Sequence, residues 1–320
     1  MHAVRIPVLD AGVVGTLFRP GSGVAGTVVC LGGSDGGVPE ATAARLAESG
    51  YAALALAYFG AVDLPQELTR VPLEYFRGAL QWLQERFDVG PTALLGASKG
   101  AEAALLTAAA FPSLVGPVVT WWPTPLVWQS MTLGDAAQLM RGISSSWTLD
   151  GRELPCASLP APMPSDFMDV QWTRWPWGNI PVPQPHFRQP SARMSHERAA
   201  SFAGERARIP VERIEGRLLL FSGSEDRVWP SDRFAEQIVE RRRRLRPELV
   251  TEHVCYEGAG HLGGLPHSTP ITSGAGPLLH GGSMGGSLEA NGAMMADSWE
   301  RALAWLSADE PASEESRDTT

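Results

Sequence analysis

Ser98 is the residue in this sequence with the clearest means to do covalent chemistry. It stands in G-A-S-K-G at residues 96–100, after an apolar run and before an alanine-rich stretch with a helical pattern. A G-x-S-x-G turn between a strand and a helix is the nucleophile-elbow pattern, in which a tight, strained turn leaves no room for side chains beside the serine. The alternative is that Ser98 only caps the helix that follows it. The context favours a nucleophile.

A serine hydroxyl is a weak nucleophile until a base accepts its proton, and a carboxylate should orient that base. In this architecture the acid and the histidine follow the serine in that order, each just after a strand. Asp226 follows R-L-L-L-F-S-G, with Glu225 as the neighbouring candidate, and His261 follows V-C-Y-E-G-A-G. The spacing predicts a Ser98, Asp226 and His261 triad. The remaining histidines are less well placed: His2, His186, His196, His253, His267 and His280.

Acyl chemistry also needs N–H donors for the negative oxygen that forms on the attacked carbonyl. One donor is expected from the backbone of Lys99, the first residue after the serine, at the positive end of a helix. The second is expected from G-G-S-D-G-G after the strand V-V-C-L, at Gly33 or Ser34. A phosphate-binding glycine loop is disfavoured, because this segment has neither the Walker pattern nor the spaced dinucleotide glycines.

The elements that must position these residues alternate between strands and helices. The β-rich runs are unbroken rather than alternating, which is typical of strands covered on both faces. We expect an N-terminal hairpin and then strands at 27–31, 51–57, 92–95, 115–120, 217–221 and 249–256. Helical patterns lie between them at 40–48, 73–87, 99–111, 232–245 and 293–306. The pattern predicts an α/β protein with a mostly parallel, doubly wound sheet, and together with the elbow and the order of the triad it predicts the α/β-hydrolase fold.

Two segments break this rhythm. Residues 121–210 are crowded with tryptophan and proline and show no clear strand, so we interpret them as a cap inserted into a single hydrolase domain over residues 1–306. Residues 263–292 are rich in glycine and serine and are expected to form a long surface loop. The acidic, polar tail at 307–320 is expected to fray.

The composition indicates which classes of partner this protein is expected to bind. The formal charge of −9 and a pI near 5.3 disfavour nucleic acid and anionic membranes, since both require a basic surface. Three scattered cysteines disfavour a disulfide framework and favour the cytoplasm. Neither a signal segment nor a membrane-length apolar run is evident. The expected partner is a small molecule.

Several motifs resemble the α/β hydrolases that form the catalytic domain of acyl-CoA thioesterases and of bile acid-CoA:amino acid N-acyltransferases, with dienelactone-hydrolase-like relatives. The resemblance is carried by L-G-G-S-D-G-G-V-P-E, P-L-E-Y-F-R-G-A-L-Q-W-L, L-L-G-A-S-K-G-A-E, S-G-S-E-D-R-V-W-P-S and Y-E-G-A-G-H. It implies the same triad of Ser98, Asp226 and His261. The amino-acid-conjugating members resemble this chain but carry a cysteine nucleophile, so the serine here favours water as the acceptor.

Three further features each have two interpretations. Tryptophans of the cap segment either line an acyl pocket or form the cap's own core; the pocket candidates are Trp121, Trp122, Trp128 and Trp175. The arginines at 241–244 and 246 either meet coenzyme A phosphates or, as their spread around a helix favours, form a solvated helix end. Lys99, the one lysine among 26 basic residues, either acts as the catalytic base or, as the presence of His261 favours, simply pairs with Glu102 three residues on in the same helix.

These residues predict a serine hydrolase of acyl thioesters or esters that works through an acyl-serine and needs no metal or cofactor. The substrate is a small-molecule acyl thioester or ester, or an acyl group on a carrier protein. The alternative is an acyltransferase in which an amine or alcohol replaces water. A binding protein without catalysis on the same fold is a third, less favoured reading.

Overall fold

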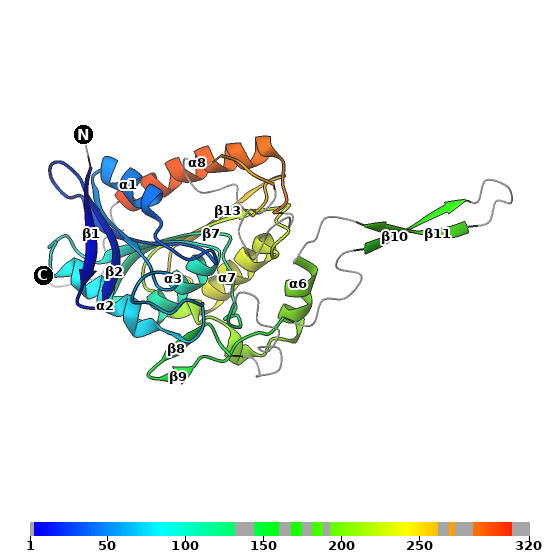
Figure 1. Ribbon diagram of the computed structural model, residues 1–320, viewed down its shortest axis with the longest axis horizontal. Coiled ribbons are helices and arrows are strands. Elements are labelled where there is room, and N and C mark those ends of the chain that lie inside the picture. Colours follow the sequence, from blue (N-terminus) through cyan, green and yellow to red (C-terminus); the bar gives the residue numbers. More distant parts are fainter. Residues whose placement is uncertain are drawn as a thin grey trace, which may run out of the picture.

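Eight strands form one sheet through the body of the molecule (Figure 1). The computed structural model describes residues 3–131, 144–159, 168–174, 181–187, 193–261, 269–272 and 284–308. Across the sheet the strands are β1 (Val4–Asp10), β2 (Val13–Arg19), β4 (Tyr51–Leu56), β3 (Gly26–Leu31), β6 (Thr92–Ala97), β7 (Val115–Trp121), β12 (Leu218–Gly223) and β13 (Thr251–Tyr256). The strands β1 and β2 form the expected hairpin, β2 pairs antiparallel with β4, and all pairs from β4 to β13 are parallel.

Helices cover both faces of this sheet, because its central strands are apolar on both sides. Figure 1 shows α1 (Glu40–Glu48) and α8 (Leu288–Ser307) on one face, with α2 (Leu73–Gln84), α3 (Lys99–Ala110) and α7 (Ser231–Leu245) on the other. Successive residues of a strand point to opposite faces. Leu94 of β6 therefore packs with the core beneath α2 and α3, whereas Leu95 packs with the core beneath α1 and α8. The predicted α/β-hydrolase fold, with a mostly parallel sheet, is confirmed.

The segment between β7 and β12 differs from the expectation that it has no clear strand. It contains β8 (Trp147–Leu149) and β9 (Arg152–Glu153), which join β5 (Val71–Pro72), and an antiparallel pair of β10 (Met168–Arg174) and β11 (Pro181–Phe187). Prolines at 181, 183 and 185 obscure β11 in the sequence. A two-stranded pair leaves every second N–H on its outer edge, where proline removes no ladder hydrogen bond. The prediction that this segment has no clear strand was therefore wrong, because a strand can accommodate prolines on its outer edge.

The same segment ends in α6 (Arg193–Phe202), followed by the short 3-10 turns η2 (Glu205–Ala207) and η3 (Val211–Arg213); a third, η1 (Pro112–Leu114), precedes β7. Within the described parts of the chain, no helix combines the length and apolarity that a membrane crossing requires.

The final helix begins earlier than expected, at Leu288 rather than near residue 293. Ser287 caps it, since its hydroxyl accepts a hydrogen bond from the Ala290 N–H at 3.0 Å. Asn291 and Gly292 are weak helix formers, which explains why the sequence reads as loop there. The predicted long loop therefore does not extend to residue 292; its parts at 263–268 and 273–283, like the tail from residue 309, lie outside the described residues.

Candidate active site

Ser98 occupies the turn between β6 and α3. Its φ of +54° lies in the left-handed region, which is strained for a residue with a side chain. A Cβ atom added at Gly96 would lie 2.2 Å from the Gly100 carbonyl oxygen, and one added at Gly100 would lie 2.3 Å from the Leu31 carbonyl oxygen. Both glycines are therefore required by close backbone approach, as the elbow motif predicts.

The side chain of Ser98 is directed to a histidine rather than to its own helix. Its Oγ lies 2.9 Å from His261 Nε2, and His261 Nδ1 lies 2.9 Å from Asp226 Oδ2. Among the described residues, no N–H of α3 bonds to the Ser98 hydroxyl. The structure thus brings the three predicted residues together in one hydrogen-bonded chain, and the reading of Ser98 as only a helix cap is not supported.

Asp226 is held by the loop that follows β12. It is completely buried, and its Oδ1 accepts hydrogen bonds from the N–H groups of Val228 at 2.9 Å and Trp229 at 3.2 Å. These bonds leave Oδ2 to face His261. The neighbouring candidate, Glu225, is exposed, so the geometry selects Asp226 over it.

His261 is fixed by aromatic packing and by the chain that leads into α8. Its ring stacks on Trp122, with centroids 4.9 Å apart, and meets the ring of Trp229 edge-on at 5.4 Å. The backbone N–H of His261 donates to the Met284 carbonyl at 2.8 Å, and the backbone N–H of the preceding Gly260 donates to the Asn291 side chain at 2.7 Å. The imidazole is therefore held on both sides before any substrate arrives.

The predicted oxyanion donors lie beside Ser98. Lys99 is the first residue of α3, so its N–H has no carbonyl partner one turn earlier in the helix. Gly33 comes just after β3 in the chain, and a Cβ atom added to it would lie 3.5 Å from the Ser98 Cβ. The loop that contains Gly33 is held by Tyr58, whose hydroxyl donates to the Gly32 carbonyl at 2.6 Å.

A cavity of about 230 Å³ opens above the serine, with Ser98, Lys99, His261, Gly33 and Ser34 in its wall. Most of the remaining described wall is apolar or aromatic: Trp122, Trp128, Met131, Leu159, Val228 and Trp229. An apolar cleft that ends at a nucleophile fits the acyl portion of a substrate better than a strongly charged group.

The predicted pocket tryptophans divide between two places. Trp122 and Trp128 line the cavity, but Trp121 is not among the described lining residues. Its indole packs against Phe221 and donates to Ser298 at 2.9 Å, so it belongs to the core beneath α8. Trp121 and Trp122 both belong to the core beneath α1 and α8, but Trp121 is the last residue of β7, whereas Trp122 lies just beyond the strand with a φ of +51° and stacks on His261. Trp175 lies outside the described residues.

The predicted pairing of Lys99 with Glu102 is present and buried. The two charged atoms are 2.5 Å apart, and the side chains are 2% and 0% exposed. Burial lowers the pKa of Lys99, and burial raises the pKa of Glu102, while in each case the partner's charge acts in the opposite direction. The pair therefore adds little net charge beside the serine.

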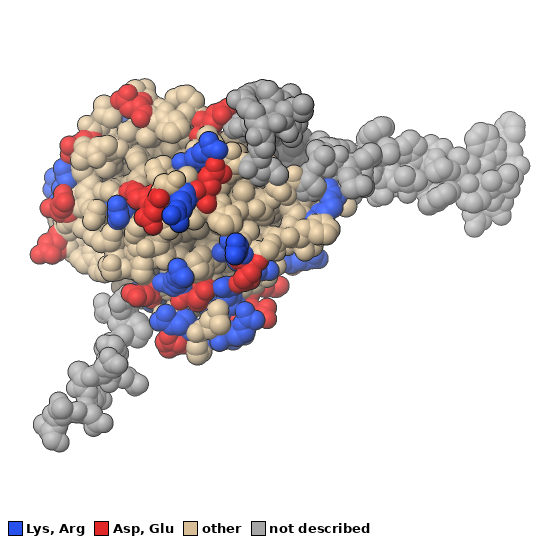
Figure 2. Space-filling view, turned by 90° about the horizontal axis from the view of Figure 1, so that it is seen from below, with Lys and Arg blue, Asp and Glu red and all other residues tan. Residues whose placement is uncertain are grey.

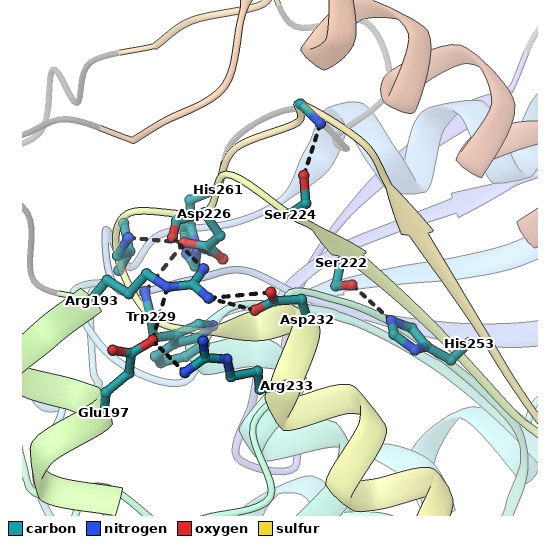
Figure 3. Close-up of polar contacts among 12 residues, drawn as sticks. Arg193, Glu197, Ser222, Ser224, Asp226, Trp229, Asp232, Arg233, His253 and His261 are labelled. Carbon is teal, nitrogen blue, oxygen red and sulfur yellow. Dashed lines mark hydrogen bonds and ion pairs between the residues drawn. The ribbon is translucent and has the colours of Figure 1, made fainter.

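Arg193 ties the inserted segment to the loop that carries Asp226 (Figure 3). Its Nη1 donates to the Asp226 carbonyl at 2.9 Å, its Nη2 donates to both oxygens of Asp232, and its Nε donates to Glu197 at 3.1 Å. The backbone N–H of Arg193 also donates to the Arg227 carbonyl at 3.0 Å. One side chain thus joins α6, the Asp226 loop and α7.

The arginine run of α7 is only partly the solvated helix end that the sequence predicts. Arg241 pairs with Glu212 and Glu205, and Arg243 and Arg244 are exposed, but Arg242 is completely buried. The helix turns about 100° per residue, so one of four consecutive arginines faces the core. In Figure 2 basic and acidic side chains are interspersed on the face shown, without a continuous basic surface.

Two of the less favoured histidines are also placed. His196 of α6 lines the cavity and meets the rings of Trp128 and Trp229 edge-on, at 4.8 and 5.7 Å. His253 bonds to Ser222 at 2.7 Å, within the sheet. The side chains of His2, His186, His267 and His280 lie outside the described residues.

Sequence reasoning missed three residues that hold the site: Trp229, Arg193 and Asn291. For Trp229 a signal exists, because it stands three residues after Asp226 in D-R-V-W-P. Arg193 and Asn291 reach the site from distant parts of the chain, and a single sequence carries no mark of such contacts.

Comparison with known proteins shows similarity to acyl-CoA thioesterases. Residues 187–309 match the protein-family model described as BAAT / Acyl-CoA thioester hydrolase C terminal. Acyl-coenzyme A thioesterase 6 of Mus musculus is 30% identical over 310 residues, which are 93% of this chain and 63% of the mouse protein. Mitochondrial acyl-coenzyme A thioesterase 2 of Mus musculus is 27% identical over 309 residues, 93% of this chain and 58% of the relative.

The chain therefore spans less than two thirds of the length of these curated relatives. Among solved structures, TT1662 from Thermus thermophilus has a TM-score of 0.51 at 18% identity and covers 97% of this chain and 100% of its own, a likeness of fold alone. This chain is an α/β hydrolase by fold, and its residues 187–309 match the family model of the BAAT / Acyl-CoA thioester hydrolase C terminal.

Proposed function

We propose that this chain is a serine hydrolase that cleaves acyl thioesters or esters through an acyl-serine intermediate. The observation that carries the proposal is the continuous hydrogen-bonded chain from Ser98 Oγ through His261 to buried Asp226, on a strained elbow at the floor of an apolar cavity. The thioesterase relatives support the choice of an acyl thioester.

In the first half-reaction Ser98 Oγ attacks the acyl carbonyl carbon while His261 Nε2 accepts the hydroxyl proton. Asp226 holds the other ring nitrogen and stabilises the imidazolium that forms. The N–H groups of Lys99 and of Gly33 or Ser34 stabilise the oxyanion. The bond to the leaving group then breaks, and His261 gives its proton to the departing thiolate or alkoxide.

In the second half-reaction water attacks the acyl-serine, with His261 again as the base. Collapse of the second tetrahedral intermediate breaks the bond to Ser98 Oγ, returns a proton to the serine and releases the free acid. The same steps transfer the acyl group to an amine or alcohol if either replaces water. Adding an amine and asking whether amide replaces free acid separates hydrolysis from acyl transfer.

The test combines turnover with direct detection of the adduct. Panels of acyl-CoA thioesters and simple esters are incubated with the wild type and with Ser98→Ala, and intact mass is measured for acyl and fluorophosphonate adducts. We expect turnover and a single adduct on the wild type and neither on Ser98→Ala. Ser130→Ala is the matched control, because Ser130 lines the same cavity without a place in the hydrogen-bonded chain.

Labelling of Ser98→Ala at the wild-type rate, or no adduct and no turnover in the wild type, would overturn the proposal and favour a binding protein on the same fold. An acyl group presented on a carrier protein is a further substrate form for the same panel. The cytoplasmic location expected from cysteine usage stays a prediction, and one relative is named as mitochondrial.

A further inference from the structure

A buried ion pair lies directly under the reacting serine, one and four residues beyond it. Lys99 and Glu102 are both withdrawn from water, and such pairs rarely stabilise a protein relative to well-packed apolar residues. Lys99 is also the one lysine in a chain that otherwise uses arginine. A buried ion pair that brings no clear gain in stability and lies next to the nucleophile suggests that the pair has a role in the active site.

The second oxygen of Glu102 holds part of the cavity wall. Glu102 Oε1 accepts a hydrogen bond from the Trp128 backbone N–H at 2.7 Å and another from the Trp147 indole at 2.7 Å. Trp128 lines the cavity, and its own indole is fixed by Thr124 at 2.8 Å. The carboxylate therefore connects the first turn of α3 to Trp128 in the cavity wall.

The same network reaches the loop that carries the second predicted oxyanion donor. The Trp147 ring packs against Tyr58, with centroids 5.8 Å apart, and Tyr58 donates to the Gly32 carbonyl. The ammonium of Lys99 also lies over the Trp147 ring, 5.4 Å from its centroid. Three parts of the site thus depend on contacts that begin at one side chain, Glu102.

We propose that Glu102 is a positioning residue for the reaction at Ser98, with Lys99 as the counter-ion that allows a carboxylate to stand there. Three donors converge on Glu102: the Lys99 ammonium, the Trp128 amide and the Trp147 indole. Only a carboxylate offers an acceptor on both oxygens, because an amide would turn its NH₂ toward one of these donors. This inference rests on the proposed hydrolase function.

The test compares two double variants, neither of which contains a buried charge at this site. Lys99→Met with Glu102→Gln keeps an amide oxygen to accept from Trp128 and Trp147, whereas Lys99→Met with Glu102→Met keeps no acceptor. Active sites are counted by fluorophosphonate titration, and kcat per titrated site and KM are measured with p-nitrophenyl butyrate. Normalising to titrated sites removes any loss due only to misfolded protein.

We expect kcat per titrated site to be roughly 10- to 100-fold lower in the Glu102→Met double variant than in the Glu102→Gln double variant, because a small misplacement of reacting groups costs that much in rate. Equal kcat per titrated site in the two double variants would overturn the inference. A wild type that neither turns over nor labels would instead overturn the proposed function, so the two failures are distinguishable.

Single substitutions provide a check that does not depend on the double variants folding. Trp147→Phe removes the indole N–H that Glu102 accepts but keeps a ring against Tyr58, and we expect a fall in kcat per titrated site. Trp82→Phe is the matched control, since that indole donates to the exposed side chain of Asp10, at 2.8 Å, and neither residue is among the described residues that line the cavity. An equal effect of both substitutions on kcat would also count against the inference.

Discussion

At the scale of single residues, the site depends on backbone approach as much as on its functional groups. Gly96 and Gly100 allow β6, α3 and the end of β3 to meet closely enough to place the Ser98 hydroxyl near His261. The strain at Ser98 is tolerated because the surrounding contacts over-determine the turn. The elbow is therefore sensitive to a single added methyl group.

Gly100→Ala tests this sensitivity. The added Cβ would lie 2.3 Å from the Leu31 carbonyl oxygen and 2.4 Å from that of Gly32, so we expect a loss of about 1–3 kcal/mol in unfolding free energy and a displaced oxyanion loop. The matched control is Gly78→Ala in α2, where an added Cβ would have no described atom from outside its own stretch of helix within 4 Å, and alanine should stabilise the helix by about 0.5–1 kcal/mol. Urea unfolding and ester turnover of both variants measure the difference; equal stabilities would contradict the close approach.

The residues of the hydrogen-bonded chain were predictable because each has a local signature. Ser98, Asp226 and His261 follow apolar strands in a fixed order, and the glycines at 96 and 100 mark the elbow. The residues that hold them were not predictable in the same way. Trp121 and Trp122 have identical types and adjacent positions, yet Trp121 ends β7 and packs on Phe221, whereas Trp122 lies beyond the strand at a positive φ and stacks on His261. A single sequence does not show at which residue the strand ends.

At the scale of elements, contacts from the inserted segment help to hold the loop of Asp226. The helix α6 presents Arg193 to this loop, and its guanidinium bridges the Asp226 carbonyl and the Asp232 carboxylate. A planar guanidinium suits this bridge because its donors are fixed in a fork, which a lysine lacks. Docking of α6 and the position of Asp226 should therefore be coupled.

Arg193→Met tests the coupling. Loss of the bridge should loosen the Asp226 loop and lower kcat/KM for a simple ester by roughly 10-fold, and Arg193→Lys should not restore it. Arg233→Met is the control, because Arg233 also pairs with Glu197 in Figure 3, at 3.3 Å, but is largely exposed and has no described bond to the Asp226 loop. If the two methionine variants have equal kcat/KM, α6 does not position the acid.

Elements of the central sheet were predictable to within a few residues, since two-sided burial leaves unbroken apolar runs between helices of regular period. The helix α1 and strands β4 and β6 follow the expected ranges closely. The errors fall where local chemistry and tertiary context disagree. Prolines made β11 look unlike a strand in the sequence. Asparagine and glycine made the start of α8 look like a loop, although Asn291 is buried there and holds the His261 loop.

At the scale of the whole molecule, two apolar layers on a parallel sheet account for most of the buried side chains, and buried charges stand out against them. In the Lys99–Glu102 pair the ammonium donates to Glu102 Oε2, Glu102 Oε1 accepts two further hydrogen bonds, and the pair adjoins the cavity. Arg242 of α7 has no such compensation: it is 0% exposed and donates one hydrogen bond, from Nη2 to the Gly216 carbonyl at 3.2 Å. Its Nε and Nη1 have no partner within the described residues.

Arg242→Met should therefore stabilise the protein. Burial, with Arg246 nearby, lowers the pKa of Arg242 to about 10, so the side chain is still charged at neutral pH and its desolvation cost is present there. Methionine has a similar reach and no charge, and we expect a gain of about 1–3 kcal/mol in unfolding free energy. Arg243→Met, the same change at the next, exposed position, should stay within about 0.5 kcal/mol of the wild type. Thermal and urea unfolding at pH 7 compare the two variants. A lower melting temperature for Arg242→Met than for Arg243→Met would mean that the guanidinium is compensated after all, and that α7 needs its charge.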